Sequence, residues 1–188
     1  MKTVGFAMTG SFCTFSKAII QLEKLVEAGY NVVPIMSQVS YETDTRFGLA
    51  EDFRSRVVAI TGHEITHTIA DAEPIGPRAL LDILVIAPAT GNTIAKLANA
   101  VNDTAVTMAA KAHLRNGRPL LIAVSTNDAL SLSAQNIGKL LNYKNVYFVP
   151  MRQDDIKKKP TSLVADFELV IPAVEAALEA RQLQPIFI

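Results

Sequence analysis

The sequence has no tryptophan and a single cysteine, Cys13, among its 188 residues. One thiol cannot form a disulfide within the chain, which excludes a small secreted fold built on disulfides. No apolar leader segment is visible at the start of the chain, so we expect a cytoplasmic protein. We interpret Cys13 as a small apolar side chain in preference to a redox thiol.

The sequence also lacks a surplus of either charge, since 18 Lys and Arg residues balance 18 Asp and Glu residues. A nucleic-acid-binding protein usually carries a basic surplus, so we expect no nucleic-acid partner. The only basic cluster is the three lysines at 157–159, most simply a solvated loop. The longest apolar run, Ile83 to Ala89, is too short to cross a bilayer, so we expect no membrane partner.

Two ligand-binding patterns are missing as well. The three-glycine G-x-G-x-x-G motif is absent, which disfavours a dinucleotide loop. No group of Cys, His and Asp residues has the spacing of a metal site, so we expect no metal.

What the chain does have is a high apolar content. Its mean hydropathy is +0.25, although only 6% of the residues are aromatic. Buried contacts between subunits would account for such a surplus in a short chain, so we expect a homo-oligomer.

Apolar segments alternate with helix-periodic ones along the whole chain. The apolar segments predict strands over residues 3–8, 31–36, 82–87, 119–124 and 145–149. The periodic segments predict helices over residues 14–28, 45–61, 93–100, 104–115, 131–141 and 162–180. The strand segments are continuous apolar runs, which is typical of parallel strands buried on both faces. The predicted class is α/β: a doubly wound, Rossmann-like parallel sheet in a three-layer α/β/α sandwich, with residues 1–188 as a single domain.

Ligands of such a sheet bind beyond the carboxyl ends of its strands. The expected strands are followed by residues 9–12 (TGSF), Ser37, residues 88–93 (PATGNT) and residues 125–128 (STND). Hydroxyl groups and free amides beside helix N-termini suit a phosphate or another anion. On pattern alone, a phosphate loop and an ordinary turn with a Ser or Thr cap are equally good interpretations.

The stretches TGS, IMS and APATGNTIAKLANAVNDTAV, after the first three strands, resemble the homo-oligomeric flavin-containing cysteine decarboxylase superfamily. Its recognition motif, Pro-Ala-Ser-Ala-Asn-Thr, corresponds to residues 88–93 here, and the similarity runs from about residue 4 to residue 167. Members bind FMN at subunit boundaries, typically of a trimer that can assemble further into a dodecamer. The resemblance implies an FMN site with its phosphate near residues 10–12, formed by Gly10, Ser11, Phe12, Ser37, Pro88, Ala89, Thr90, Asn92, Thr93 and Asn127.

Two activities of the superfamily match this chain less well. The decarboxylases carry a histidine 14 residues before the motif proline, where this chain has Pro74. They also carry Pro-Ala-Met-Asn after the fourth strand, of which only Asn127 is kept. The prenyltransferases carry an Arg-Glu pair where this chain has Thr126 and Asn127, which removes a phosphate contact and a proton donor. A stand-alone FMN-dependent decarboxylase or prenyltransferase stays an alternative.

The stretches MTGSFCTF, MSQVSYETDTRFG, HTIADAEPIGP and APATGNTIAKLA most resemble the family of dipicolinate synthase B chains. In that family the B chain is a flavoprotein-like partner of a separate NAD(P)-dependent A chain. Together they oxidise a dihydrodipicolinate-type intermediate to pyridine-2,6-dicarboxylate during sporulation. The resemblance thus implies an oxidoreductase component whose partners are the dipicolinate synthase A chain, which holds NAD(P), and a small dicarboxylate. A flavin-fold scaffold that only supports the A chain is a further alternative.

No catalytic residue can be assigned from the sequence. Arg46, Arg78 and Arg152 are all candidates to pair with a dicarboxylate, and the spacing favours none of them. His63 and His67 are interpreted as residues of a surface loop.

Overall fold

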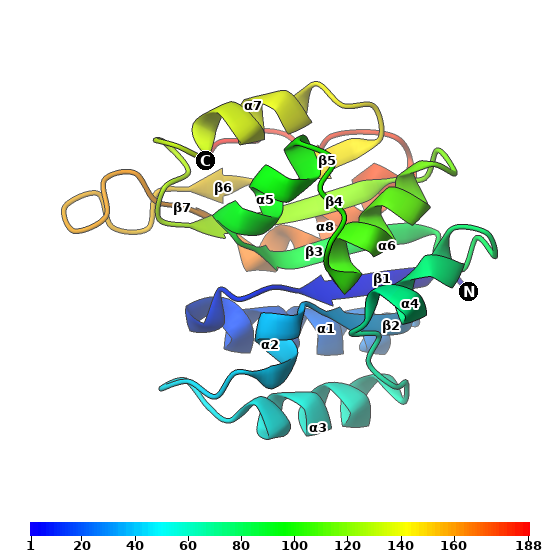
Figure 1. Ribbon diagram of the computed structural model, residues 1–188. Helices are drawn as coiled ribbons and strands as arrows, with labels where there is room; N and C mark the ends of the chain where they lie inside the picture. Colours follow the sequence, from blue (N-terminus) through cyan, green and yellow to red (C-terminus); the bar gives the residue numbers. More distant parts are fainter.

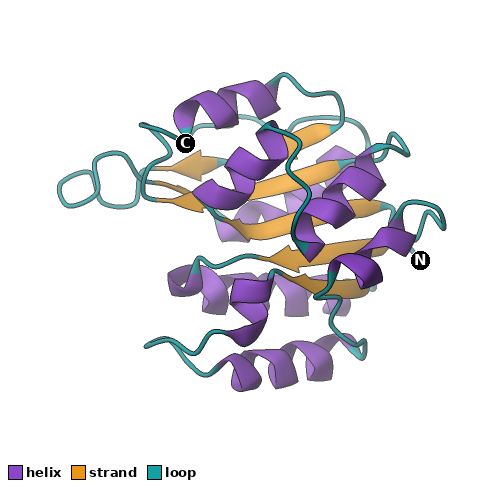
Figure 2. Cartoon of the chain, in the orientation of Figure 1, coloured by secondary structure: helices purple, strands orange, loops and turns teal.

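The computed structural model describes all residues 1–188 and contains one seven-stranded sheet with helices on both faces (Figures 1 and 2). The strand order is β2-β1-β3-β4-β7-β6, and β5 pairs with β4 outside this path. This arrangement confirms the predicted α/β class and its three layers. The strands are β1 (Thr3–Met8), β2 (Asn31–Met36), β3 (Ile83–Ala89), β4 (Leu120–Thr126), β5 (Val146–Phe148), β6 (Met151–Arg152) and β7 (Leu163–Ala165).

The sheet is mixed, although β1 to β5 pair in parallel as expected. The last two residues of β4 pair antiparallel with β7, and β7 pairs antiparallel with β6. The prediction of a helix from residue 162 onward is therefore wrong at its start, because residues 163–165 form β7. A strand of three residues is too short to show a periodicity that separates it from a helix.

Three helices cover one face of the sheet and four cover the other (Figure 1). The first face carries α1 (Phe15–Glu27), α3 (Ala50–Thr61) and α8 (Val170–Leu178). The second carries α4 (Ile69–Ala72), α5 (Gly91–Ala98), α6 (Ala105–Leu114) and α7 (Ala134–Leu141). The remaining helical segments are α2 (Gln38–Glu42) and the 3-10 turns Phe12–Thr14, Glu73–Ile75 and Phe167–Leu169. No helix is both long and apolar enough to span a membrane.

The single helix expected over residues 45–61 is wrong in its first part. The chain forms α2 before this stretch and enters α3 only at Ala50. A tight turn intervenes, in which Thr45 and Gly48 exchange backbone hydrogen bonds. The carboxylate of Asp44 then accepts a hydrogen bond from the Ala50 amide at 2.8 Å, which satisfies a free donor at the start of α3.

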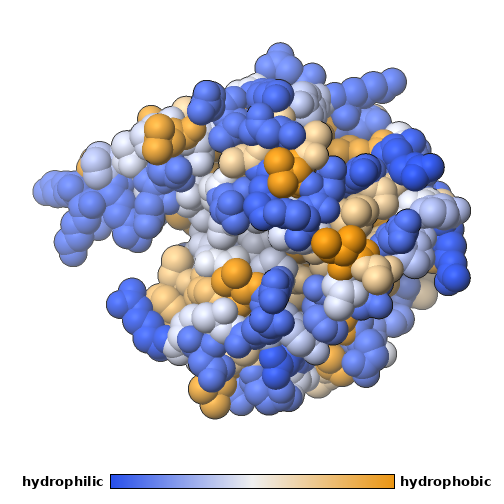
Figure 3. Space-filling model, viewed as in Figure 1, coloured by the Kyte–Doolittle hydropathy of each residue, from blue (hydrophilic) through white to orange (hydrophobic).

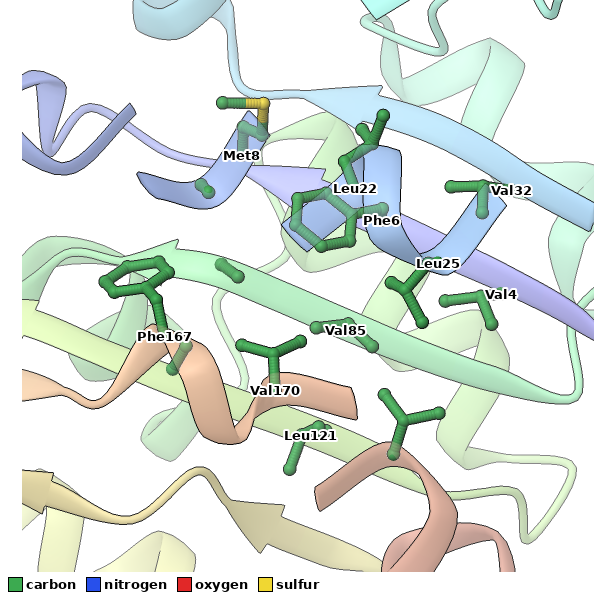
Figure 4. Packing of buried hydrophobic residues seen from close by; sticks show 14 of the residues in the cluster. Val4, Phe6, Met8, Leu22, Leu25, Val32, Val85, Leu121, Phe167 and Val170 are labelled. Atoms are coloured by element: carbon green, nitrogen blue, oxygen red, sulfur yellow. The ribbon is translucent and has the colours of Figure 1, made fainter. Parts of the chain in front are cut away.

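Alternate residues of the central strands supply the two halves of the core. Phe6 of β1 points into the cluster with α1 and α8 (Figure 4), whereas its neighbour Ala7 belongs to the cluster on the opposite face. Every residue of β3 is buried, as expected for a central parallel strand. Because a buried Phe or Leu side chain contributes about 1.5–3 kcal/mol, these strands form a rigid base for the loops at their carboxyl ends.

Candidate functional site

Two adjoining cavities open at the carboxyl ends of the parallel strands, and Gly10 and Thr90 line both of them. We call the first, of about 430 Å³, the hairpin cavity because the β6–β7 hairpin forms one wall. The second, of about 440 Å³, is the helix-cap cavity, because it lies at the N-termini of α2, α5 and α6. Figure 3 shows a hollow beneath a projecting hydrophilic arm, which is the loop between β6 and β7. The site therefore lies where an open parallel sheet is expected to bind ligands.

Three hydroxyl groups meet in the hairpin cavity. The Ser11 Oγ lies 2.8 Å from the Ser125 Oγ, and the Thr14 Oγ1 lies 3.2 Å from that same Ser125 atom. Thr14 also donates to the Ser11 carbonyl oxygen at 2.9 Å. Since Ser11 and Thr14 follow β1 and Ser125 lies at the end of β4, the cluster joins loops that are far apart in the sequence. Hydroxyl groups can reorient to donate to an incoming anion.

The side chain of Thr9 connects the ends of β1 and β3. Its hydroxyl donates to the Pro88 carbonyl oxygen at 2.8 Å and accepts from the Thr90 amide at 3.0 Å. The Thr9 amide also donates to the same Pro88 oxygen at 3.2 Å. These bonds hold the loop after β3 against the loop after β1, so Gly10 and Thr90 stay together at the junction of the cavities.

The first residue of α5, Gly91, lies against the loop after β4. A Cβ atom at this position would lie 2.8 Å from each of three oxygens, in Asp128, Ser133 and Thr126. The Asp128 carboxylate already accepts from the Thr126 hydroxyl at 2.6 Å and from the Ser133 hydroxyl at 2.9 Å. Only glycine fits here without displacing this network, which explains why this chain has glycine at the fourth position of residues 88–93, where the superfamily motif has alanine.

Hydroxyl groups in the helix-cap cavity cap the helices that they precede. Ser37 accepts from the Ser40 amide at 3.3 Å, and Thr90 accepts from the Thr93 amide at 3.2 Å. Thr104 accepts from the Thr107 amide at 3.1 Å, in a capping box at the start of α6. Each bond satisfies one free amide of a first turn and favours the start of the helix at that position.

One ion pair lines the helix-cap cavity. Lys96 donates to the Asp103 carboxylate at 2.7 Å, and this hydrogen bond lowers the pKa of Asp103. The cation of this cavity is therefore already paired.

Seven of the ten predicted site residues line a cavity, and three do not. Gly10 and Thr90 line both cavities, Ser11 and Asn127 line the hairpin cavity, and Ser37, Asn92 and Thr93 line the helix-cap cavity. Phe12 instead packs its ring 4.9 Å from that of Phe15, at the edge of the core. Pro88 and Ala89 are buried in β3, where Pro88 contributes its carbonyl oxygen to Thr9. Direct contact with a cofactor thus stays a prediction for all ten residues, and the geometry gives Phe12, Pro88 and Ala89 supporting positions.

The candidate arginines and histidines lie outside both cavities. Arg152 pairs with Asp166, and the Arg46 guanidinium lies over the Phe47 ring at 4.9 Å. Neither Arg78 nor the two histidines 63 and 67 line either cavity. Cys13 is exposed and lines the hairpin cavity. No group of three or more His, Cys, Asp or Glu side chains could hold a metal ion.

Sequence reasoning missed the charged wall of the hairpin cavity, formed by Lys17, Asp154, Lys159 and Ser162. Lys159 ends the basic run that the sequence suggested to be a solvated loop. This loop joins β6 and β7, which are too short to recognise in the sequence. The position of the loop beside the hairpin cavity therefore could not be inferred. The one available signal was the charge of the run itself.

Comparison with known proteins places the chain in a family. The family model described as Flavoprotein matches residues 1–174. The B subunit of dipicolinate synthase from Bacillus subtilis (strain 168) is 46% identical over 187 residues, which cover 100% of this chain and 94% of that protein. The crystal structure of the dipicolinate synthase B subunit from Bacillus halodurans C is also 46% identical, with a TM-score of 0.92 over 100% of this chain and 96% of that one. The FMN-dependent cysteine decarboxylase SpaF shares the fold at 21% identity, with a TM-score of 0.67 over 96% of this chain and 97% of that one.

The chain therefore belongs to the Flavoprotein family and, within it, to the family of dipicolinate synthase B chains. The predicted membership of the flavoprotein superfamily and of the dipicolinate synthase B chains is thus confirmed.

Proposed function

We propose that the chain is the flavin-binding component of a two-chain oxidoreductase that forms pyridine-2,6-dicarboxylate during sporulation. Its partner would be an NAD(P)-dependent A chain, and its substrate a dihydrodipicolinate-type intermediate. The full-length similarity to dipicolinate synthase B chains supports this assignment. Aromatisation removes two hydrogens from the intermediate, so the reaction needs a two-electron acceptor, either the flavin or the nicotinamide.

One structural observation carries the flavin part of the proposal. Ser11, Thr14 and Ser125 gather their hydroxyl groups beside Gly10, at the point where the two cavities meet. A phosphate needs several donors and close approach to the backbone, and this junction supplies both. The residues are consistent with the FMN phosphate lying near Gly10 and Ser11.

The size and the chemistry of the cavities are compatible with FMN. Each has a volume within the range of about 300–1,000 Å³ that small-molecule sites occupy. The helix-cap cavity offers hydroxyl and amide groups from Ser37, Thr90, Asn92 and Thr93 to the polar parts of a flavin. Only one of its lining residues is hydrophobic, so one chain provides little apolar surface for an isoalloxazine ring. A second copy of the chain would supply it, in agreement with the expected homo-oligomer.

Bound FMN would supply hydride-transfer chemistry. The chain itself would hold the phosphate at Gly10 and Ser11 and would orient the flavin with the caps of α2 and α5. Asn127, which lines the hairpin cavity, would face the same ligand. The carboxylates that line the cavities, Asp103 and Asp154, are each paired with a lysine, so we assign proton transfer to the substrate, the solvent or the A chain.

The experiment is a reconstitution of this chain with the A chain. We expect turnover of the two-chain complex to require FMN, and anaerobic addition of the intermediate to bleach the flavin absorbance. Ser11→Ala should lower the affinity for FMN and the turnover together. Turnover without FMN, with this chain raising only the stability of its partner, would contradict the flavin role and favour the scaffold alternative. Turnover by this chain alone would contradict the need for the A chain.

A further inference from the structure

The far wall of the hairpin cavity carries charge and a free hydroxyl group. Lys159 and Ser162 come from the loop between β6 and β7, which projects over the cavity (Figures 1 and 3). Lys17 reaches the same cavity from α1. None of these three residues was among the positions expected to bind the flavin.

Ser162 is the one residue with a buried side-chain polar atom that lacks a hydrogen-bond partner. Ser162 lines the hairpin cavity, although the residue is only 1% exposed. Buried hydroxyl groups are nearly always hydrogen-bonded, because leaving one unpaired costs free energy. An unpaired hydroxyl beside a cavity is therefore available to donate to a ligand.

The two lysines of this wall form at most one long ion pair. Lys17 has no carboxylate within salt-bridge distance, and the Lys159 ammonium lies 3.4 Å from the Asp154 carboxylate. The pKa of Asp154 is lowered: partial burial acts to raise it, but the nearby Ser162 hydroxyl and Lys159 ammonium favour the charged form and prevail. The Ser162 hydroxyl is close to Asp154 but does not reach hydrogen-bond geometry with it. Asp154 thus holds Lys159 loosely, and a ligand carboxylate could replace it.

We propose that Lys159, Ser162 and Lys17 bind the carboxylate groups of a small dicarboxylate in the hairpin cavity. This inference rests on the proposed function, because that function makes a dicarboxylate the substrate and product. Two ammonium groups from different elements would face the two carboxylates of such a ligand, and the Asp154 carboxylate offsets one of these positive charges. The Ser162 hydroxyl would donate its free hydrogen to one carboxylate.

The ion pair of Lys159 shows that this wall accommodates a carboxylate. Asp154 supplies that carboxylate. A carboxylate of the ligand would replace it as the partner of Lys159. The hydroxyl groups on the opposite side, in Ser11, Thr14 and Ser125, remain available for the flavin phosphate. The two ligands would then occupy neighbouring parts of one site.

The test is calorimetric titration of the full-length chain with pyridine-2,6-dicarboxylate, with and without FMN. Benzene-1,3-dicarboxylate has the same arrangement of carboxylates but chelates metals poorly, so it excludes an effect of a contaminating cation. Pyridine-2-carboxylate, a monoanion, tests the need for two charges. The variants are Lys159→Gln and Ser162→Ala, and Lys158→Gln is the matched control, because it removes a charge from the same loop without touching the cavity.

We expect both dianions to bind at least about tenfold more tightly than the monoanion. Lys159→Gln should weaken dianion binding about tenfold or more, and Ser162→Ala about threefold to tenfold. Lys158→Gln should leave the affinity unchanged. Equal losses in the Lys159 and Lys158 variants, or equal affinity for monoanion and dianion, would overturn the inference.

The test separates this inference from the flavin proposal. If FMN binds but no dianion does, only the dicarboxylate site is wrong. If the dianions bind with the expected dependence on Lys159 but FMN does not, the flavin proposal fails and the dicarboxylate site stands. Inorganic phosphate that competes as strongly as the dianions would assign the wall to a phosphate and overturn the inference.

Discussion

The two cavities use the same kinds of side chain in different ways. In the helix-cap cavity, Ser37, Thr90 and Thr104 bond to amides three residues ahead, and Lys96 bonds to Asp103 seven residues ahead. In the hairpin cavity, Ser11 bonds to Ser125, 114 residues away, and Lys159 is held only loosely. One cavity is therefore built from local interactions and the other from long-range ones.

This difference matters for what each cavity can bind. Hydroxyl groups engaged as helix caps are already satisfied, so the helix-cap cavity is preorganised and would bind a ligand without rearranging its helices. The hydroxyl and ammonium groups of the hairpin cavity can exchange partners when an anion enters. We therefore expect mutations in the hairpin cavity to alter binding and global stability together, and mutations in the helix-cap cavity to act more locally.

The largest expected effect is at Gly91, which lines neither cavity but makes a long-range contact between the start of α5 and the loop after β4, so its effect should be global. Gly91→Ala should lower the free energy of unfolding by about 1–3 kcal/mol, toward the upper end of this range, because the new Cβ would displace three oxygens. Urea denaturation measures this change. Gly138→Ala is the matched control: it lies in a helix with no atom near the new Cβ, and should be neutral or stabilising by up to about 1 kcal/mol. Equal changes in both variants would show that α5 does not depend on the close contact.

A pair of serine variants tests whether the hairpin cavity depends on long-range bonds and the helix-cap cavity on local ones. Ser125→Ala removes two long-range hydrogen bonds and should cost about 1–2 kcal/mol of global stability. Ser37→Ala removes the cap of a five-residue helix, so its cost should lie at the low end of about 0.5–2 kcal/mol. Hydrogen exchange would place the second effect within α2 alone. A global effect of Ser37→Ala as large as that of Ser125→Ala would contradict the distinction between the cavities.

A crossed pair of aspartate variants should change ligand affinity by smaller amounts. Asp154→Asn frees Lys159 and should tighten dicarboxylate binding about two- to fivefold, without changing FMN binding. Asp103→Asn frees Lys96 in the other cavity and should raise the affinity for FMN by a similar factor, without changing dicarboxylate binding. Titrations of both variants with both ligands provide the measurement. If each variant altered both affinities alike, the cavities would not be separate subsites.

The smallest expected effect is a pH response that arises outside both cavities. Burial lowers the pKa of His113, whose Nε2 lies 2.9 Å from the Pro119 carbonyl oxygen. Because the folded state favours neutral His113, this residue contributes fully to the free energy of unfolding above the unfolded pKa of about 6.5. This contribution to stability is lost as the pH falls from that value through the lower pKa of the folded state. His113→Gln should flatten the dependence of unfolding free energy on pH between about 7 and 5 and leave the affinity for FMN unchanged. An unchanged slope would contradict this assignment.

The sequence predicts which residues follow a strand or lie within one motif, but not how those of the hairpin cavity pair with distant loops. Thr90 and Thr93 lie within one motif, and Ser37 directly follows an apolar strand, so pattern alone indicates their positions. The pairing of Ser11 with Ser125, and the return of Lys159 and Ser162 to the cavity, depend on how distant loops meet. No local pattern encodes these contacts. The same reason explains why the parallel strands were predicted well, whereas the two- and three-residue strands β6 and β7 were not.

The central claim is that the cavities at the carboxyl ends of β1, β3 and β4 bind FMN. The most direct test is titration of the purified chain with FMN, followed by flavin fluorescence and then by gel filtration, with Ser125→Ala alongside. We predict saturable binding of one FMN per chain, flavin absorbance that elutes with the protein, and an affinity lowered about tenfold in the variant. A chain that leaves the flavin fluorescence unchanged at all concentrations would contradict the claim.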